Sequence, residues 1–524
     1  MTDTPQASSH STMTRSGVLR ALVLIALAAG FSLVAVADGA AQFRPTTGPG
    51  PTGPTIGPIN PVGPANPVFT PGANDPIGRG GPRLPSAVID IPSDIRPYGP
   101  VVIDNLEEYR RRLIVNRFTW TKKKQPKQIA QRGGFDAPPP GEQNYVQNEV
   151  LLTISPSVQI PTLNAMARQH RLRQMESQEF ALTGRKLFRW RIDDGRPVAI
   201  VIRTLMADAR ILAAQPNYLH RTQEDAPAEA KPDEPAAQTE SPQYALAKLR
   251  LPQAHAISKG DSIVVAVIDT SIDLAHPELA GVIAGTFNAM GVAEKPQPHG
   301  TAMAGAIAAR GKLTGAAPGV KLLAIQAFGT TRSEGTSFNI LKGLEWAAKE
   351  NANIINMSFA GPSDPALRVA LAAAHAKGIV LIAAAGNAGP RSRPLYPAAD
   401  PNVIAVTATD PDDKLFERAN RGTHIAVAAP GVNILVAAPD GGYQTTSGTS
   451  VAAAEVSGIA ALMLERDRKL DPAEVRRLLT TTARDLGPPG PDEQFGAGLA
   501  DAYGALTALG AKPTASVPHE SGTR

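Results

Sequence analysis

A short stretch near the C-terminal end of the chain has residues that permit nucleophilic chemistry. SGTSVAAAEVSG runs from Ser447 to Gly458, and its alanines favour a helix that packs closely in a core. Ser450 would lie at the N-terminus of that helix, where unpaired backbone N–H groups favour negative charge. The serine could simply cap the helix, the commonest role at such a position. It could also be a nucleophile whose oxyanion is received by the same N–H groups.

Three further polar residues occur at the ends of apolar runs or at the starts of helices. Asp269 ends the run SIVVAVID and could be a partly buried carboxylate or a turn residue. His299, in PHGTAMAGAIAAR, begins a helix, where the dipole favours a neutral ring suited to act as a general base beside a carboxylate. Asn387, in LIAAAGNAGP, could be a turn residue or an amide donor to an oxyanion. Asp273 and His276 compete for these roles, although a structural turn role fits them better.

The elements that would position these residues form the pattern of a parallel α/β sheet. Five apolar runs have the length of strands, at residues 262–269, 320–328, 353–359, 378–386 and 402–409. Helical patterns such as FNILKGLEWAAKE and DPALRVALAAAHAK lie between them. Buried strands that alternate with helices indicate a parallel sheet, in which sites form at the carboxyl ends of the strands.

The segments around the polar residues resemble the subtilisin-like serine proteases (subtilases, peptidase family S8) over nearly all of residues 243–510. The resemblance is carried by VAVIDTSID, HGTAMAGAIAA, INMSFAG, AAAGNAG and GTSVAAAEVSG, and by the chain order Asp269, His299, Ser450. It implies a subtilisin-like α/β fold, mostly a parallel sheet with helices on both faces. It also implies a serine endopeptidase that hydrolyses peptide bonds through an acyl-enzyme.

The resemblance further implies a role for each matching residue. Ser450 would attack the peptide carbonyl and His299 would take its proton, while Asp269 orients the imidazole. Asn387 would complete an oxyanion hole. An extended substrate is expected to contact Gly335, Ser358, Phe359, Ala360, Ala384, Ala385 and Gly386.

Several positions depart from the family pattern without removing a reacting atom. Ser271 and Ala360 stand where glycine is usual, and Ala454 replaces a usual proline, so the shape of the pocket is what these changes affect. Arg391 and Arg393 could line the pocket rim and disfavour basic substrates, or simply face solvent. Members of the family often bind calcium, but the sequence has no compact run of acidic ligands, so no cofactor or metal site is expected.

A second, smaller pattern precedes this domain at residues 149–221. Its order of strands and helices (β-α-β-β-α-β) is typical of a ferredoxin-like α+β fold. The unit resembles the propeptides of subtilases, which implies an intramolecular chaperone and inhibitor whose C-terminus enters the active site. Residues 222–242 carry six acidic side chains and one lysine, and are expected to be an exposed linker. Self-cleavage of a zymogen would fall there, between Arg221 and Gln243.

The N-terminal part of the chain indicates export. Arg15 and Arg20 precede an uncharged apolar stretch, Ala21–Ala37, so residues 1–41 are interpreted as a signal peptide or a membrane anchor of a secreted or periplasmic protein. Residues 42–148 are expected to be disordered, first Gly/Pro-rich and then basic. The basic part could be solvated or could contact an anionic envelope surface. Residues 511–524 have the pattern of a disordered tail.

Composition excludes several other classes of protein. The 524 residues include no cysteine, which excludes disulfides and thiol catalysis. Lys and Arg number 52 against 47 Asp and Glu, a balance that does not suit a nucleic-acid partner. A nucleotide-binding α/β protein would need a phosphate loop, and no G-x-x-x-x-G-K-[ST] occurs. The expected partners are peptide or protein substrates and the chain's own propeptide. The alternative to an active protease is a catalytically idle, protease-like envelope or binding protein.

Overall fold

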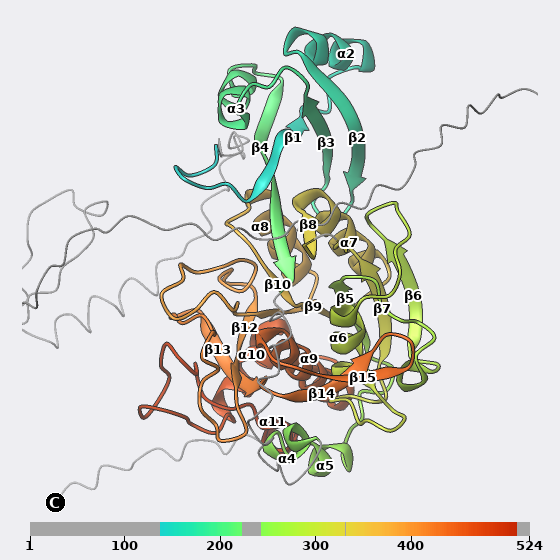
Figure 1. Ribbon diagram of the computed structural model, residues 1–524, viewed down its shortest axis with the longest axis vertical. Helices are drawn as coiled ribbons and strands as arrows, with labels where there is room; N and C mark the ends of the chain where they lie inside the picture. Colours follow the sequence, from blue (N-terminus) through green and yellow to red (C-terminus); the bar gives the residue numbers. More distant parts are fainter. Residues whose placement is uncertain (1–136, 223–242, 331, 511–524) are drawn as a thin grey trace, which may run out of the picture. The chain divides into compact units, whose positions relative to one another are not determined.

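The computed structural model describes residues 137–222, 243–330 and 332–510. The first of these segments is an α+β unit, called here the N-terminal unit, in which antiparallel strands lie in the order β4-β1-β3-β2 (Figure 1). That order is the ferredoxin-like arrangement predicted from the sequence. Its elements are β1 (Tyr145–Ile154), α2 (Ile160–Gln169), β2 (Leu172–Phe180), β3 (Arg185–Ile192), α3 (Val198–Met206) and β4 (Ile211–Thr222).

The two faces of this small sheet pack against different partners because successive strand residues point to opposite faces. Val150 and Leu152 of β1 belong to a core with α2 and α3, in which Trp190 is fully buried. Leu151 lies between them in sequence and joins a different core, together with Phe180 and residues of the C-terminal domain. The N-terminal unit is therefore packed onto the rest of the described chain.

The N-terminal unit begins earlier than the sequence indicated. The strand β1 starts at Tyr145, whereas the boundary was expected at residue 149, so residues 145–148 were wrongly placed in the disordered region. The ring of Tyr145 packs edge-on against Tyr218, with ring centroids 6.5 Å apart. The buried Glu142 carboxylate accepts the N–H groups of Gln143 and Asn144, at 3.0 and 2.9 Å. The residues YVQN have no strand pattern in the sequence, so the start of β1 was not predicted. The contacts of Tyr145 and Glu142 stabilise it.

In the described part of the C-terminal domain, a seven-stranded parallel sheet has the order β13-β12-β11-β9-β5-β7-β6. The predicted α/β fold class is thus confirmed. The strands β5, β7, β9, β11 and β12 are the five apolar runs. The sheet comprises β5 (Val264–Asp269), β6 (Ile283–Asn288), β7 (Lys321–Gln326), β9 (Ile354–Met357), β11 (Val380–Ala384), β12 (Ile404–Thr409) and β13 (Ile425–Pro430).

Helices cover both faces of this sheet. Val265 and Val267 of β5 belong to one apolar cluster with α6 and α9, whereas Ala266 and Ile268 belong to another with α7 and α8. Every residue of α9 from Thr449 to Leu464 is buried, which explains why its side chains are small or apolar apart from Glu455. These helices are α6 (Pro298–Ala308), α7 (Ser337–Lys349), α8 (Pro365–Ala376) and α9 (Thr449–Arg466).

The peripheral elements were the ones that the sequence did not indicate. The strand β6 alternates between half-buried and exposed residues and lies at a sheet edge, so it is not an apolar run. A hairpin of β14 (Ile434–Ala438) and β15 (Gly442–Thr446) packs on α6 and was also not predicted.

The remaining elements are α4 (Tyr244–Lys248), α5 (Leu251–His255), the 3₁₀ turn η2 (Pro277–Leu279), α10 (Pro472–Thr481) and α11 (Ala502–Gly510).

One strand of the N-terminal unit continues into the C-terminal domain. The first part of β4 pairs with β1, and its last residues pair with β8 (Glu334–Thr336) on one side and β10 (Phe359–Ala360) on the other. Figure 1 shows β4 as the light green arrow that runs toward these two short strands. The extended end of β4 therefore occupies a groove whose two edges are strands of the C-terminal domain.

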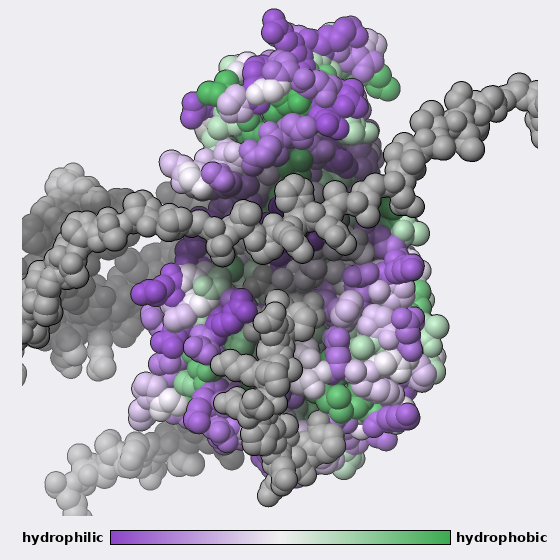
Figure 2. All heavy atoms as spheres, in the orientation of Figure 1, coloured by the Kyte–Doolittle hydropathy of each residue, from purple (hydrophilic) through white to green (hydrophobic). Residues whose placement is uncertain are grey.

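The outer surface is ordinary for a folded domain. The face visible in Figure 2 is mostly hydrophilic, and its hydrophobic residues are scattered. None of the helices within the described ranges is both long enough and apolar enough to cross a membrane. The apolar stretch Ala21–Ala37 lies outside those ranges.

Candidate active site

The carboxyl ends of three neighbouring strands carry the polar residues that the sequence singled out. The strands β5, β9 and β11 are adjacent and parallel, so their ends meet at one edge of the sheet. Asp269 is the last residue of β5, Ser358 follows β9, and Asn387 lies in the loop after β11. The helices α6 and α9, which carry His299 and Ser450 as their second residues, pack against each other beside these strands.

Asp269 and His299 form a buried pair. The Asp269 Oδ1 atom lies 2.7 Å from His299 Nδ1, and the two side chains are 0% and 3% exposed. The same oxygen accepts the backbone N–H of Thr270 at 2.7 Å and its hydroxyl at 3.2 Å, which fixes the carboxylate. A carboxylate can only accept, so Nδ1 carries a proton, and in the tautomer that this contact favours Nε2 is the basic nitrogen.

Ser450 is the second residue of α9 and is held by reciprocal contacts with Ser358. The Ser450 hydroxyl donates to the Ser358 carbonyl at 3.2 Å, and the Ser358 hydroxyl donates to the Ser450 carbonyl at 3.0 Å. The Ser358 hydroxyl in turn accepts from the Asn356 amide at 3.0 Å. Deeper in α9, the Ser457 hydroxyl donates to the side-chain oxygen Oδ1 of Asn356, also at 3.0 Å. This buried network fixes the start of the serine helix relative to β9.

The side chain of Asn387 is oriented by the residue that precedes Ser450. Its Oδ1 atom accepts both the backbone N–H of Thr449 at 3.1 Å and the Thr449 hydroxyl at 2.9 Å. That hydroxyl also accepts the N–H of Gly386 at 3.1 Å. Because Oδ1 is held from the α9 side, the NH₂ end of the amide is fixed as the donor end.

A second asparagine holds the other side of the same loop. Asn420 donates to the Ala385 carbonyl at 3.1 Å and accepts the Ala388 N–H at 2.9 Å. Between them, Gly386 has a φ of +109°, and a Cβ there would lie 2.6 Å from Asn420 Nδ2. Only glycine fits this conformation and this close approach. The loop that carries Asn387 is therefore rigid on both sides.

Sequence reasoning missed the positioning roles of Thr449, Asn356 and Asn420. Thr449 had a signal, since a second hydroxyl stands directly before Ser450. The two asparagines had none, because an isolated asparagine in a loop or strand has the same sequence pattern as a turn residue.

Three of the residues predicted to flank a substrate belong to the strands that pair with β4. Gly335 lies in β8 opposite His220, and Phe359 and Ala360 form β10 opposite Thr222 and Arg221. Ala384 ends β11, and Ala385 and Gly386 begin the loop to Asn387; all are buried.

The competing residues Asp273 and His276 hold loops in place. Asp273 accepts the backbone N–H groups of Ala275 and Asp440, at 3.1 and 3.0 Å. His276 caps the turn η2 by accepting the Glu278 N–H at 3.1 Å. Of the two candidate rim arginines, Arg393 is ion-paired with Glu142 of the N-terminal unit.

A search of the described residues finds no group of three or more His, Asp or Glu side chains that could hold a metal ion. The expectation that calcium has no clear site here therefore stays a prediction.

Comparisons with known proteins identify the family to which this fold belongs. Residues 260–498 match the model of the subtilase family. Subtilisin DY of Bacillus licheniformis is 38% identical over 238 residues, covering 44% of this chain and 86% of that protein. Thermitase of Thermoactinomyces vulgaris is 34% identical over 274 residues, covering 51% of this chain and 96% of that protein.

A solved structure extends the similarity beyond the C-terminal domain. Fervidolysin from Fervidobacterium pennivorans, described as a keratinolytic enzyme related to subtilisin, matches with a TM-score of 0.58 and 25% identity. The match covers 69% of this chain and 61% of fervidolysin. This chain belongs to the subtilase family and is a serine-type endopeptidase.

Proposed function

We propose that the protein cleaves peptide bonds with Ser450 as nucleophile, His299 as general base and Asp269 as the residue that orients the imidazole. The observation that carries the proposal is the 2.7 Å contact between Asp269 Oδ1 and His299 Nδ1, which leaves Nε2 as the basic nitrogen. Its position on the edge that also bears Ser450 supports proton transfer between the two.

The proposed reaction follows from these groups. His299 Nε2 takes the Ser450 hydroxyl proton while Oγ bonds to the substrate carbonyl carbon. The negative charge moves to the carbonyl oxygen, which receives N–H groups from Asn387 and the Ser450 backbone. The C–N bond then breaks as the imidazolium returns its proton to the leaving amine. Water, deprotonated by the same ring, hydrolyses the acyl-enzyme.

The N-terminal unit is proposed to act as the chain's own inhibitor and folding aid, so that the enzyme is made as a zymogen. The support is that β4 adds a strand between β8 and β10, as an extended substrate would. Glu345 of α7 adds to the docking, because its two carboxylate oxygens accept the N–H groups of Ala181 and Leu182, both at 2.9 Å.

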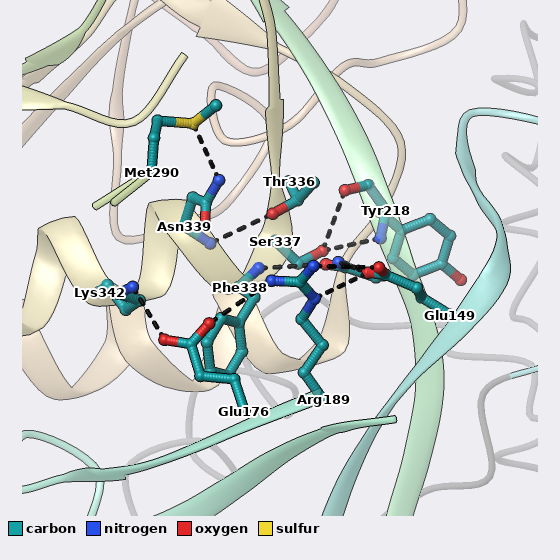
Figure 3. Close-up of polar contacts among 11 residues, drawn as sticks. Glu149, Glu176, Arg189, Tyr218, Met290, Thr336, Ser337, Phe338, Asn339 and Lys342 are labelled. Carbon is teal, nitrogen blue, oxygen red and sulfur yellow. Dashed lines mark hydrogen bonds and ion pairs between the residues drawn. The ribbon is translucent and has the colours of Figure 1, made fainter. Parts of the chain in front are cut away.

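A polar cluster at the start of α7 secures the same docking (Figure 3). Asn217 of β4 accepts the Phe338 N–H at 3.2 Å and donates to Glu149 at 2.8 Å. Glu149 is itself held by Arg189 through two bonds, at 2.9 and 3.1 Å. The helix N-terminus thus receives a buried polar group backed by a carboxylate, an arrangement that its dipole favours. The Ser337 hydroxyl accepts the Tyr218 N–H at 2.9 Å.

The register of β4 supports one particular bond for self-cleavage. Thr222 pairs with Phe359, and Ser358, one residue earlier, has the carbonyl that accepts the Ser450 hydroxyl. An extended peptide that continues this register would place its next residue opposite Ser358. We therefore infer that the zymogen cleaves itself between Gln223 and Glu224, which lie outside the described residues and within the linker expected to be cut.

Export is also part of the proposal and depends on the apolar stretch Ala21–Ala37 preceded by arginines. The N-terminal region would then be removed as a signal peptide or kept as an anchor.

An activity assay on three proteins tests the proposed function. The full chain should process itself and hydrolyse casein. Ser450→Ala should stay full length and lose activity about 10⁴-fold or more, as should His299→Ala. A wild-type protein that folds but leaves casein intact would instead favour the idle, protease-like binding protein.

A further inference from the structure

A histidine of the N-terminal unit and an aspartate of the C-terminal domain meet in complete burial. His220 of β4 and Asp364, just before α8, are both 0% exposed, and His220 Nε2 lies 3.6 Å from Asp364 Oδ2. Neither of these two atoms has a hydrogen-bond partner within the described residues. Buried polar atoms require partners, so each of these groups is the other's counterpart.

Two residues of the C-terminal domain pack closely around the imidazole of His220. Phe359 contacts the imidazole edge-on, with ring centroids 6.0 Å apart and planes at 79°. The backbone of Gly361 lies on the other ring surface, so closely that an added Cβ would fall 2.3 Å from His220 Nδ1. The carboxylate lies 3.6 Å from His220 Nε2, so its position suits the length of a histidine side chain.

Asp364 belongs to the domain that remains when the N-terminal unit leaves. Its Oδ1 caps α8 by accepting the Leu367 N–H at 3.1 Å and also accepts the Gln215 amide at 2.8 Å. Burial would raise the pKa of this carboxyl, but His220, with smaller contributions from Ser337 and Gln215, keeps that pKa below its usual value. After processing, Gln215 and His220 would depart together and leave the Asp364 carboxyl without these two partners.

Register relates His220 to the scissile bond. His220 pairs with Gly335, and cleavage after Gln223 makes His220 the fourth residue before that bond. We propose that Asp364 is a specificity-determining residue, and that it selects protein substrates with histidine at the fourth position before the cleaved bond. This inference rests on the proposed function. An apolar side chain at that position would bury the carboxylate without a partner, a loss worth about tenfold or more in kcat/KM.

The test uses processed enzyme from the full chain and fluorogenic peptides that share the sequence X-Arg-Thr-Gln-Glu-Asp, with X as His, Phe or Ala. Wild type should cleave the His peptide with a kcat/KM about tenfold or more above the Phe and Ala peptides. Asp364→Asn, which still caps α8, should remove that preference, so that the three peptides are cleaved within about twofold of one another. Gly361→Ala should reduce kcat/KM for the His peptide to that of the Ala peptide, because the added methyl group fills the space that the imidazole needs.

Three results would overturn the inference. The first is equal cleavage of all three peptides by wild type, and the second is a His preference that persists in Asp364→Asn. The third is a cut at a different bond, detected by mass spectrometry of the products. If neither the peptides nor casein is cleaved by wild type, the proposed function itself fails, which the casein control distinguishes from a failure of the specificity alone.

Discussion

Replacing Thr449 by valine should slow the chemical step while leaving substrate binding intact. The Thr449 hydroxyl is fully buried, donates to Asn387 Oδ1 at 2.9 Å and accepts the Gly386 N–H at 3.1 Å. Valine keeps the shape but removes both bonds. Asn387 Oδ1 would keep the backbone N–H of residue 449, at 3.1 Å, but lose the hydroxyl bond, so the amide would be less firmly oriented.

The expected size of the effect follows from these contacts. Removing an oxyanion donor altogether costs about 10²–10³ in turnover, a value that comes from subtilisin itself. Thr449→Val removes the side-chain bond that helps to orient the donor, worth about 1.4 kcal/mol, so kcat should fall about tenfold. KM should stay within about twofold because the oxyanion forms only in the transition state. The unpaired Gly386 N–H should also lower the free energy of unfolding by about 1–3 kcal/mol.

Steady-state kinetics on a single peptide substrate tests this reasoning, with Thr449→Ser as the matched control that keeps the hydroxyl. The serine variant should lie within about threefold of wild type. In an Asn387→Ala background, Thr449→Val should add little, because its effect acts through the amide that is already gone. An unchanged kcat in Thr449→Val, or the same tenfold loss without Asn387, would refute the positioning role.

Three further predictions address docking, pH dependence and processing. Glu345→Ala should weaken inhibition by the severed N-terminal unit about tenfold, seen as a shorter lag before full activity; an unchanged lag would be evidence against this docking. Burial raises the pKa of Glu455 well above 4.5, so the folded state binds its proton more tightly and wild-type stability should fall as pH rises above that value. Glu455→Gln, in the Ser450→Ala background, should therefore gain melting temperature relative to its parent at pH 8 more than at pH 5, and parallel pH profiles would contradict this. N-terminal sequencing of the mature protein should begin at Glu224, and a start elsewhere would revise the register.

The sequence allowed the central sheet to be predicted because parallel strands buried on both faces are continuous apolar runs. The strand β6 is not a continuous apolar run and was not predicted, because residues such as Ile283 are only half-buried at the sheet edge. The strand β13 is fully buried, but its alanines and terminal proline are weak strand formers. Packing, rather than local preference, makes it a strand.

The candidate site could be predicted only as far as local motifs extend. Asp269, His299, Asn387 and Ser450 each lie in a distinctive segment, and family resemblance supplied their order. Asp364 precedes a proline at the start of α8, so its sequence context indicates a helix cap, which it also is. Its contact with His220 crosses two domains, and strand order in space cannot be read from separation along the chain.

Identification of the residue that reacts with a fluorophosphonate tests the central claim most directly. The processed protein should carry one covalent adduct, and tandem mass spectrometry should locate it on Ser450. Labelling should be absent in Ser450→Ala and strongly slowed in His299→Ala, whose folds thermal unfolding can verify. An adduct on another residue, or labelling that survives the loss of Ser450, would contradict the assigned nucleophile.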